Sequence, residues 1–170
     1  MLKSLFRERR RTSAVHALNV LNSPPEPGFD RFVERAAISF NAPIALLSLI
    51  HGNQQWFKAT RGVDIVCNPR HRSFCTFALD KPDVLEICDP CSDPRVAELP
   101  AVNAAPFVRY YIGVPLRVTG GIDVGALCVF DTQRRNPASS DQKAYLIALA
   151  RQAAVALESR ADLLQMEGTA

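Results

Sequence analysis

The sequence predicts an α+β protein in which helices cover an antiparallel sheet. Two hairpins predict the sheet: residues 43–62 and 107–131 are rich in β-prone residues and are interrupted by turn sequences at 51–53 and 119–121. Apolar residues at helical spacing before, between and after these hairpins predict the helices. Because both hairpins are apolar on both faces, something must cover each side of the sheet.

Three longer helices follow from apolar stripes and their end signals. Residues 13–21 and 30–40 carry apolar side chains at helical spacing, and the proline-rich stretch 22–28 separates them. After Ser139-Ser140-Asp141, a long helix is expected to run to about Met166. Its apolar stripe is close to a heptad, which is typical of helices that also pack on a partner.

The middle of the chain predicts shorter elements. Residues 63–72 have no clear period and are expected to form a loop, whereas residues 83–87 are expected to form a strand. Ser73 is a good N-cap for a short helix. Asp93, with Pro94 in the first turn, predicts a second short helix.

Length and composition indicate one ordinary globular domain. At 170 residues, with 48% hydrophobic and 22% charged residues, the chain is long enough to bury a core without disulfides. The net charge of +3 is mild and gathers at the start of the chain. We expect residues 1–12 to be a solvated, partly disordered basic arm rather than a lipid or nucleic-acid site. Residues 13–166 would then form the domain and 167–170 a tail.

The chain shows no apolar run that could span a bilayer and no secretory signal. A cytoplasmic location is therefore expected, with reduced cysteines. The five cysteines are odd in number and irregularly spaced, which argues against a disulfide framework.

Four ordered strings resemble the GAF domain, and more narrowly the bacterial signalling subgroup found with histidine kinases and diguanylate cyclases: "LNSPPEPGFDRFVERAAISFNAPIALLSLIHGNQQWFKATRGV", "SFCTFAL", "DPCSDPRV" and "RYYIGVPLRVTGGIDVGALCVFD". The resemblance covers residues 17–157. It implies a PAS-like antiparallel sheet sandwiched between the terminal helices on one face and, on the other, a small-molecule pocket roofed by the middle loops and short helices. It also implies a sensory role, often as a dimer.

The sub-activities of this family are tested residue by residue, because the fold alone does not assign a function. The Asn-Lys…Phe…Asp-Glu signature of cyclic-nucleotide-binding members is absent from the sequence. Bilin-carrying members attach the pigment to a cysteine commonly followed by histidine, but Thr76 follows Cys75 here. Phe77 stands where many relatives of the subgroup have a histidine. The sequence shows no output module, so the domain is expected to report to a separate protein or through its own dimer.

The candidate pocket residues come from the second strand, the short helix at 73–79 and the loops after it. They are Trp56, Phe57, Ser73, Cys75, Phe77, Asp89, Arg109 and Tyr111. Trp56 and Phe57 are adjacent, so one faces each side of the sheet. Arg109 lies in an apolar segment and must find an anion or carbonyls. Asp89 or Asp131 could be its structural partner, and a ligand carboxylate or phosphate is the alternative.

The C-x-x-C pair of Cys88 and Cys91 allows a redox site, half a metal site, or no site. Metal binding is not expected, because no second pair of ligands has suitable spacing. Cys91 precedes the Asp93 turn, so a redox role is an alternative to a small buried Cys88 and a loop Cys91. Cys128, in "ALCVF", is expected to be a core residue.

The expected function is a stand-alone GAF sensory or regulatory domain that binds a small molecule or a partner protein without catalysis, and without cofactor, metal or nucleic acid. The first alternative is a thiol-based redox sensor or a free methionine-R-sulfoxide reductase-like enzyme using Cys91 with Cys75 or Cys88. The second is a ligand-free dimerisation module whose pocket is filled by side chains such as Phe77. In each case a homodimer through the terminal helices is expected.

Overall fold

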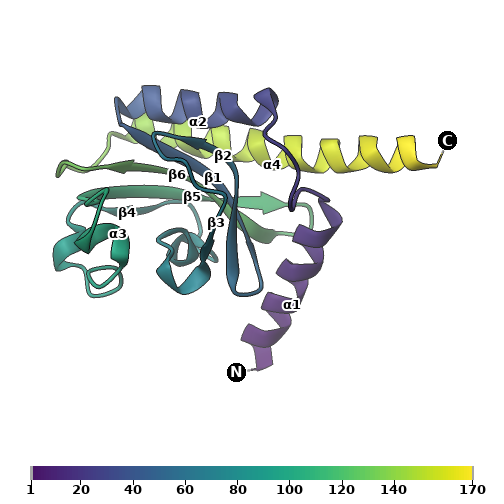
Figure 1. Cartoon of the computed structure of the whole chain (residues 1–170), viewed down its shortest axis with the longest axis horizontal. Coiled ribbons are helices and arrows are strands. Elements are labelled where there is room, and N and C mark those ends of the chain that lie inside the picture. The colour runs from purple at the N-terminus through teal and green to yellow at the C-terminus, as the bar shows by residue number, and fades with distance from the viewer. Residues whose placement is uncertain (1, 170) are drawn as a thin grey trace.

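The computed structural model describes residues 2–169, so Met1 and Ala170, the outermost residues of the predicted arm and tail, lie outside it. A six-stranded sheet of order β3-β2-β1-β6-β5-β4 forms its centre (Figure 1). The strands are β1 (Ile44–His51), β2 (Gln54–Arg61), β3 (Cys67–Pro69), β4 (Leu85–Ile87), β5 (Tyr110–Val118) and β6 (Ile122–Asp131). The α-helices are α1 (Leu2–Ala17), α2 (Pro27–Phe40), α3 (Pro100–Asn103) and α4 (Ser140–Gly168), and three 3-10 turns are η1 (Arg70–Arg72), η2 (Cys75–Ala78) and η3 (Pro90–Ser92).

Every strand pairing is antiparallel, as predicted. The two predicted hairpins, β1–β2 and β5–β6, are joined through the central β1–β6 pair. Residues 44–50 of β1 are all buried, which explains the uninterrupted apolar run in the sequence. The sheet therefore separates two apolar layers.

One face of the sheet is covered by α2 and α4, which lie side by side (Figure 1). Their core includes Val33 of α2, Leu47 of β1, Leu127 of β6, and Leu149 and Leu157 of α4. The first and last helices share this face as expected, since Val15 and Leu18 belong to the same core as the α4 residues, but α2 lies between the sheet and solvent beside α4. Only the C-terminal end of α1 reaches this core, and the rest of α1 runs away from the sheet (Figure 1).

The prediction of a partly disordered N-terminal arm at residues 1–12 was wrong, because α1 begins at Leu2 instead of near residue 13. A buried arginine holds this helix in place: Arg11 is 1% exposed, and its Nε donates to the backbone carbonyl of Asp123 at 2.6 Å. At the other end of the chain, α4 begins with the capping box of Ser139 and Gln142 and continues through Gly168, into the predicted tail.

The middle segment differs from the prediction at two points. Residues 67–69, expected to be a loop, form the short edge strand β3 against β2. Asp93 does cap a turn, since its carboxylate accepts from the Arg95 N–H at 2.9 Å and its carbonyl accepts from the Ala97 N–H at 2.8 Å, but residues 94–98 form only this turn and no regular helix. The helix of this region, α3, starts six residues after Pro94, at Pro100. Ser73 does act as a cap, since its Oγ accepts from the Thr76 N–H at 3.3 Å.

Candidate functional site

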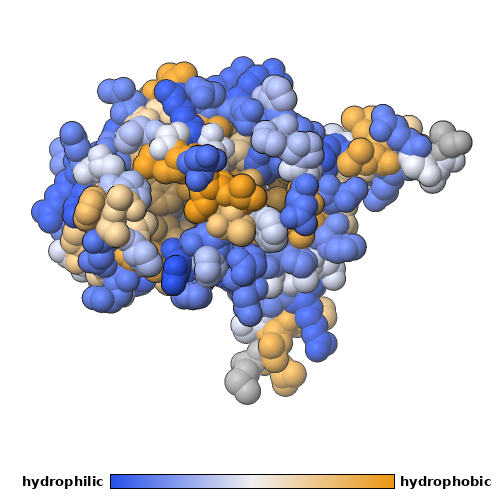
Figure 2. Space-filling model, in the orientation of Figure 1, coloured by the Kyte–Doolittle hydropathy of each residue, from blue (hydrophilic) through white to orange (hydrophobic). Residues whose placement is uncertain are grey.

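A cavity of about 250 Å³ lies on the face of the sheet that is opposite α2 and α4. Strands β1, β2 and β6 form its floor, and the segments 63–75 and 101–108 form its rim and roof. Figure 2 shows apolar side chains gathered in the middle of the viewed face and surrounded by hydrophilic ones. The lining residues are Ile44, Leu46, Gln55, Phe57, Val63, Asp64, Ile65, Asn68, Arg72, Ser73, Phe74, Cys75, Ala101, Pro106, Val108 and Phe130.

The side chains of the floor come from every second residue of a strand, because successive side chains point to opposite faces of the sheet. Ile44 and Leu46 are two residues apart on β1, as are Gln55 and Phe57 on β2, so each pair faces the cavity. Beside this floor, the lining residue Phe74 stacks on Tyr111, which lies behind it, at a centroid distance of 5.2 Å. The edge of Phe130 meets Tyr111 at 5.0 Å and Phe74 at 5.5 Å. Three interlocked rings make this wall rigid.

The polar groups of the cavity are few and mostly near its mouth. Asp64, Asn68 and Arg72 come from the segment that includes β3 and η1, and the Arg72 side chain is exposed. Deeper in the cavity, the Gln55 side-chain amide donates to Ser48 Oγ at 2.9 Å. An apolar chamber with a small number of polar groups at its entrance is typical of small-molecule sites.

Three of the predicted pocket residues, Phe57, Ser73 and Cys75, line this cavity. Tyr111 and Phe77 do not line it and instead pack in the apolar cluster behind its wall. Trp56 pairs with Leu49 of the helix-side core, so its ring lies on the opposite face of the sheet. The sequence could therefore separate Trp56 from Phe57 but could not assign each to a face.

Arg109 and Asp89 lie outside the cavity. The prediction that Asp89 or Asp131 pairs with the Arg109 side chain was wrong. The Arg109 guanidinium donates to the backbone carbonyls of Val102 and Val108, both at 2.9 Å. Asp131 instead accepts from Arg135, four residues along the chain. Asp89 forms an ion pair with Arg134 and accepts a hydrogen bond from Ser92. Carbonyls satisfy Arg109 because it stands just before β5, where the loop curls back over it.

Most lining residues were missed because they come from segments without periodicity. Gln55 and Leu46 could have been found by counting two residues along each strand from Phe57 and from Ile44. Val63, Arg72 and Val108 carry no such signal, since only the folded loops bring them together.

The C-x-x-C cysteines have few features of a reactive pair. Burial and the nearby Glu86 carboxylate raise the pKa of the Cys88 thiol, which disfavours its thiolate. Cys91 is exposed in η3, a turn of three residues. Cys75 and Cys128 are different, because their sulfur atoms lie 2.8 Å apart. Within residues 2–169, no three His, Cys, Asp or Glu side chains converge as a metal site would require.

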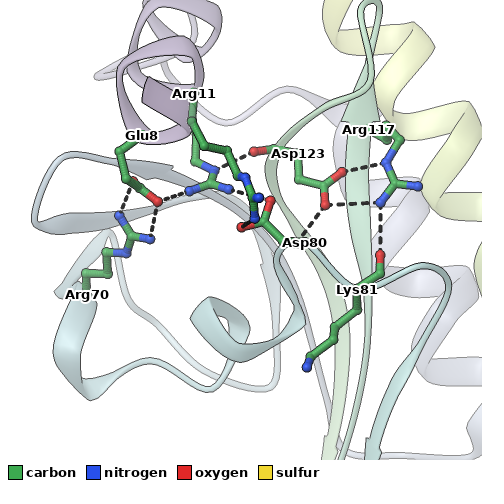
Figure 3. A network of polar contacts seen from close by, with 8 residues as sticks. Glu8, Arg11, Arg70, Asp80, Lys81, Arg117 and Asp123 are labelled. Atoms are coloured by element: carbon green, nitrogen blue, oxygen red, sulfur yellow. Dashed lines mark hydrogen bonds and ion pairs between the residues drawn. The ribbon is translucent and has the colours of Figure 1, made fainter. Parts of the chain in front are cut away.

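A polar network connects the rim of the cavity to α1 (Figure 3). The Glu8 carboxylate on α1 accepts two hydrogen bonds from Arg70 of η1, at 2.6 and 3.0 Å. These bonds lower the pKa of Glu8, and the charge of Arg11 adds to the effect. Arg72, two residues after Arg70, lines the cavity. The segment 70–72 therefore contacts α1 through Arg70 and the cavity through Arg72.

The network continues from α1 to the turn at Asp80 (Figure 3). Arg11 donates to the Asp80 carboxylate at 3.0 Å and also pairs with Glu8. The Asp80 backbone N–H donates to the Asp123 carboxylate at 2.8 Å, which Arg117 also binds. Because η2 lies between Arg70 and Asp80, both ends of the cavity wall are fastened to α1.

Comparison with known proteins decides the family. The sequence model of the GAF domain matches residues 24–157. The chain belongs to the GAF domain family. Its antiparallel sheet and flanking helices agree with this, so the predicted family and fold class are confirmed.

The GAF chain is similar to proteins of several functions. A cyclic di-GMP phosphodiesterase of Pseudomonas aeruginosa is 36% identical over 144 residues, which is 85% of this chain and 24% of that protein. The chain thus spans about a quarter of that relative. Among solved structures, the blue-light absorbing form of the PixJ GAF domain of Thermosynechococcus elongatus has a TM-score of 0.64 at 14% identity, over 83% of this chain and 89% of that one. A type II free methionine-R-sulfoxide reductase of Thermoplasma acidophilum has a TM-score of 0.62 at 15% identity, and the match covers 90% of this chain and 96% of that one. At these identities the structures share the fold.

No helix within residues 2–169 combines the length and the apolar character that crossing a bilayer requires.

Proposed function

We propose that this GAF domain is a regulatory sensor that binds a small, mostly apolar molecule in the cavity and does not transform it. The observation that supports this most is the cavity itself: a chamber of about 250 Å³ with an apolar floor and Asp64, Asn68 and Arg72 at its mouth. An apolar body with one polar or anionic group complements that lining. None of the lining residues is a histidine, so the chamber has no imidazole to act as a general base.

The route by which binding would be reported starts at the rim. A ligand that contacts Arg72 or Ser73 acts on the segment that holds Arg70, and Arg70 binds Glu8 of α1. A ligand changes the position of α1 only if it binds the two arrangements of this segment with different affinities. The difference in binding free energy between the two arrangements would then equal the change in the free energy with which α1 is held against the domain.

The process that this sensor would control is proposed from its relative. The similar Pseudomonas protein is named a cyclic di-GMP phosphodiesterase, and this chain matches about a quarter of it. We place the domain in the cytoplasm, upstream of an output protein or domain that acts on a nucleotide second messenger. The domain would regulate that output without carrying its chemistry.

A homodimer through the terminal helices is part of this proposal. Both α1 and α4 extend beyond the body of the protein (Figure 1). Exposed apolar side chains lie on the projecting ends, Leu5 and Phe6 on α1 and Leu163 and Met166 on α4. Covering such residues with a second copy removes apolar surface from water. Light scattering on the purified protein would give twice the chain mass for a dimer and the chain mass if this part is wrong.

Ligand binding is tested with a variant that fills the cavity. Ala101 lines the chamber, whereas Ala104 lies three residues away on the exposed side of the same segment. Native mass spectrometry of freshly purified protein, and thermal unfolding with a panel of small aromatic and aliphatic acids, would detect a ligand. A ligand at 100 times its dissociation constant adds about 2.7 kcal/mol of stability.

Ala101→Phe is expected to abolish this stabilisation, while Ala104→Phe keeps it. Equal stabilisation of both variants would place binding elsewhere. No stabilisation by any compound, together with no bound mass, would contradict the sensor and support the ligand-free dimerisation module instead.

A further inference from the structure

Two buried cysteines meet at the wall of the cavity, although they are 53 positions apart in the chain. Cys75 lies in η2 and is 1% exposed, and Cys128 lies in the middle of β6 and is fully buried. Their sulfur atoms are 2.8 Å apart, and both are free thiols. A disulfide requires an S–S distance of about 2.05 Å, so a movement of less than about 1 Å would be enough to form one.

The cavity gives one of these thiols a route to small reagents. Cys75 is among the lining residues, whereas Cys128 is not and lies behind it in the sheet. A molecule as small as a hydroperoxide can enter a chamber of about 250 Å³ and meet Cys75 first. The geometry therefore distinguishes an accessible thiol from one that is sheltered by it.

Polar neighbours favour ionisation of the accessible thiol. Burial by itself would raise the pKa of Cys75, but hydrogen bonds from Cys128, Ser48 and Tyr111 lower it. Ser48 Oγ already accepts from Gln55, which leaves the Ser48 hydroxyl hydrogen free to donate to sulfur. Burial raises the pKa of Cys128 well above its ordinary value, and the neighbouring Cys75 adds to this. Cys75 is thus the better nucleophile of the pair.

The space around Cys128 is shaped for this arrangement. Tyr111 places its hydroxyl 3.2 Å from Cys128 Sγ. The hydroxyl fits there because residue 113 is a glycine: a Cβ on Gly113 would lie 2.1 Å from the Tyr111 oxygen and 3.1 Å from Cys128 Sγ. A hydroxyl that can donate to either sulfur stands beside a thiol pair in an otherwise apolar core.

We propose that Cys75 and Cys128 are a reversible thiol–disulfide site that hydroperoxides oxidise through the cavity. The Cys75 thiol loses its proton, and its thiolate attacks the hydroxyl oxygen of the hydroperoxide. The O–O bond breaks, and the other oxygen leaves as water or alcohol with the proton that Cys75 lost. Cys75 is then a sulfenic acid. The Cys128 sulfur attacks the Cys75 sulfur, the S–O bond breaks, and the hydroxide leaves as water with the Cys128 proton.

Over both steps two thiols and one hydroperoxide become one disulfide, one water and one water or alcohol. The cysteines lose two electrons in total, and the peroxide oxygens gain them. A dithiol restores the pair by thiol–disulfide exchange. The disulfide would tie η2 to β6, and with it the cavity wall that lies between Arg70 and Asp80. This site does not depend on the ligand proposed above.

The test uses the full chain, purified under reducing conditions and then treated with hydrogen peroxide. Remaining thiols are labelled with N-ethylmaleimide in denaturant and counted by intact mass. The reduced protein has five cysteines to label, and the oxidised protein is expected to accept three labels and to lose two hydrogen atoms. Cleavage with trypsin and a glutamyl endopeptidase separates Cys75 from Cys88, because Glu86 lies between them. The expected product is residues 73–86 cross-linked to residues 118–134.

Two variants serve as control and second measurement. A protein with Cys67→Ser and Cys91→Ser lacks the exposed thiols and is expected to form the same cross-link. Cys128→Ala is expected to stop at a Cys75 sulfenic acid, which dimedone traps. If Cys128→Ala does not fold, the peptide map of the wild type still decides the matter. Peptides 73–86 and 118–134 that both keep their labels after peroxide treatment, or cross-links that involve only other cysteines, would overturn the proposal.

Discussion

Replacing Arg11 by methionine tests whether a buried arginine fastens α1 to the domain. Its Nε binds the Asp123 carbonyl at 2.6 Å, and its other nitrogens bind Glu8 and Asp80. Methionine keeps much of the apolar stem and removes every donor. A buried carbonyl left without its donor costs about 1–3 kcal/mol.

The two lost ion pairs contribute less to the destabilisation, because each carboxylate still has a second arginine as its partner. Glu8 still binds Arg70, and Asp80 still lies 3.3 Å from Arg7. Both carboxylates are partly exposed, so each lost pair contributes at most about 1 kcal/mol. The expected loss is therefore about 1–5 kcal/mol in the free energy of unfolding. For a chain of this size, that lowers the melting temperature by about 2–20 °C.

The assay is urea and thermal unfolding followed by circular dichroism, with Arg9→Met as the matched control. Arg9 lies on the same helix and is exposed, so its substitution should change the free energy of unfolding by less than about 0.5 kcal/mol. Hydrogen exchange in α1 would show whether the helix detaches before the rest of the domain unfolds. If Arg11→Met and Arg9→Met are equally stable, the reasoning about the buried arginine is wrong.

Two further predictions concern packing and acid stability. Gly113→Ala should destabilise the domain by about 1–3 kcal/mol in urea unfolding, since its Cβ would overlap the Tyr111 ring. Gly28→Ala, with open space at its Cβ, should not destabilise it, and equal effects of the two changes would contradict the packing argument. Burial would raise the pKa of Glu86, but hydrogen bonds, led by that from Lys143, lower it. The folded pKa lies below the ordinary value of 4.5, so Glu86 stabilises the fold above that pH and loses this effect as pH falls through the folded pKa. Unfolding between pH 6 and pH 3 should depend less on pH in Glu86→Gln, and identical pH profiles would refute this.

The elements with local signals were predictable from the sequence. The two hairpins and the start of α4 agree with the structure, because turn residues and the Ser139 cap act within a few positions of chain. The Asp93 cap was predictable as well, since its carboxylate accepts from the Arg95 N–H two residues later. The extent of the helix was not, because the turn after Asp93 does not continue and α3 begins only at Pro100.

The site was only partly predictable. Phe57, Ser73 and Cys75 follow from strand alternation and from the short helix expected after Ser73, and they do line the cavity. Arg109 was correctly expected to need polar partners. Its partners proved to be the carbonyls of Val102 and Val108, and carbonyls carry no identity in a sequence.

By itself, the sequence determined that two apolar hairpins form one antiparallel sheet that must be covered on both faces, because side-chain alternation and turn chemistry are local properties. Only the tertiary structure decided that α1 continues to Leu2 around a buried Arg11, and that Cys75 meets Cys128 instead of Cys91. These features depend on distances between segments tens of residues apart. Such distances are set when the apolar layers on the two faces of the sheet pack, and no pattern along the chain records them.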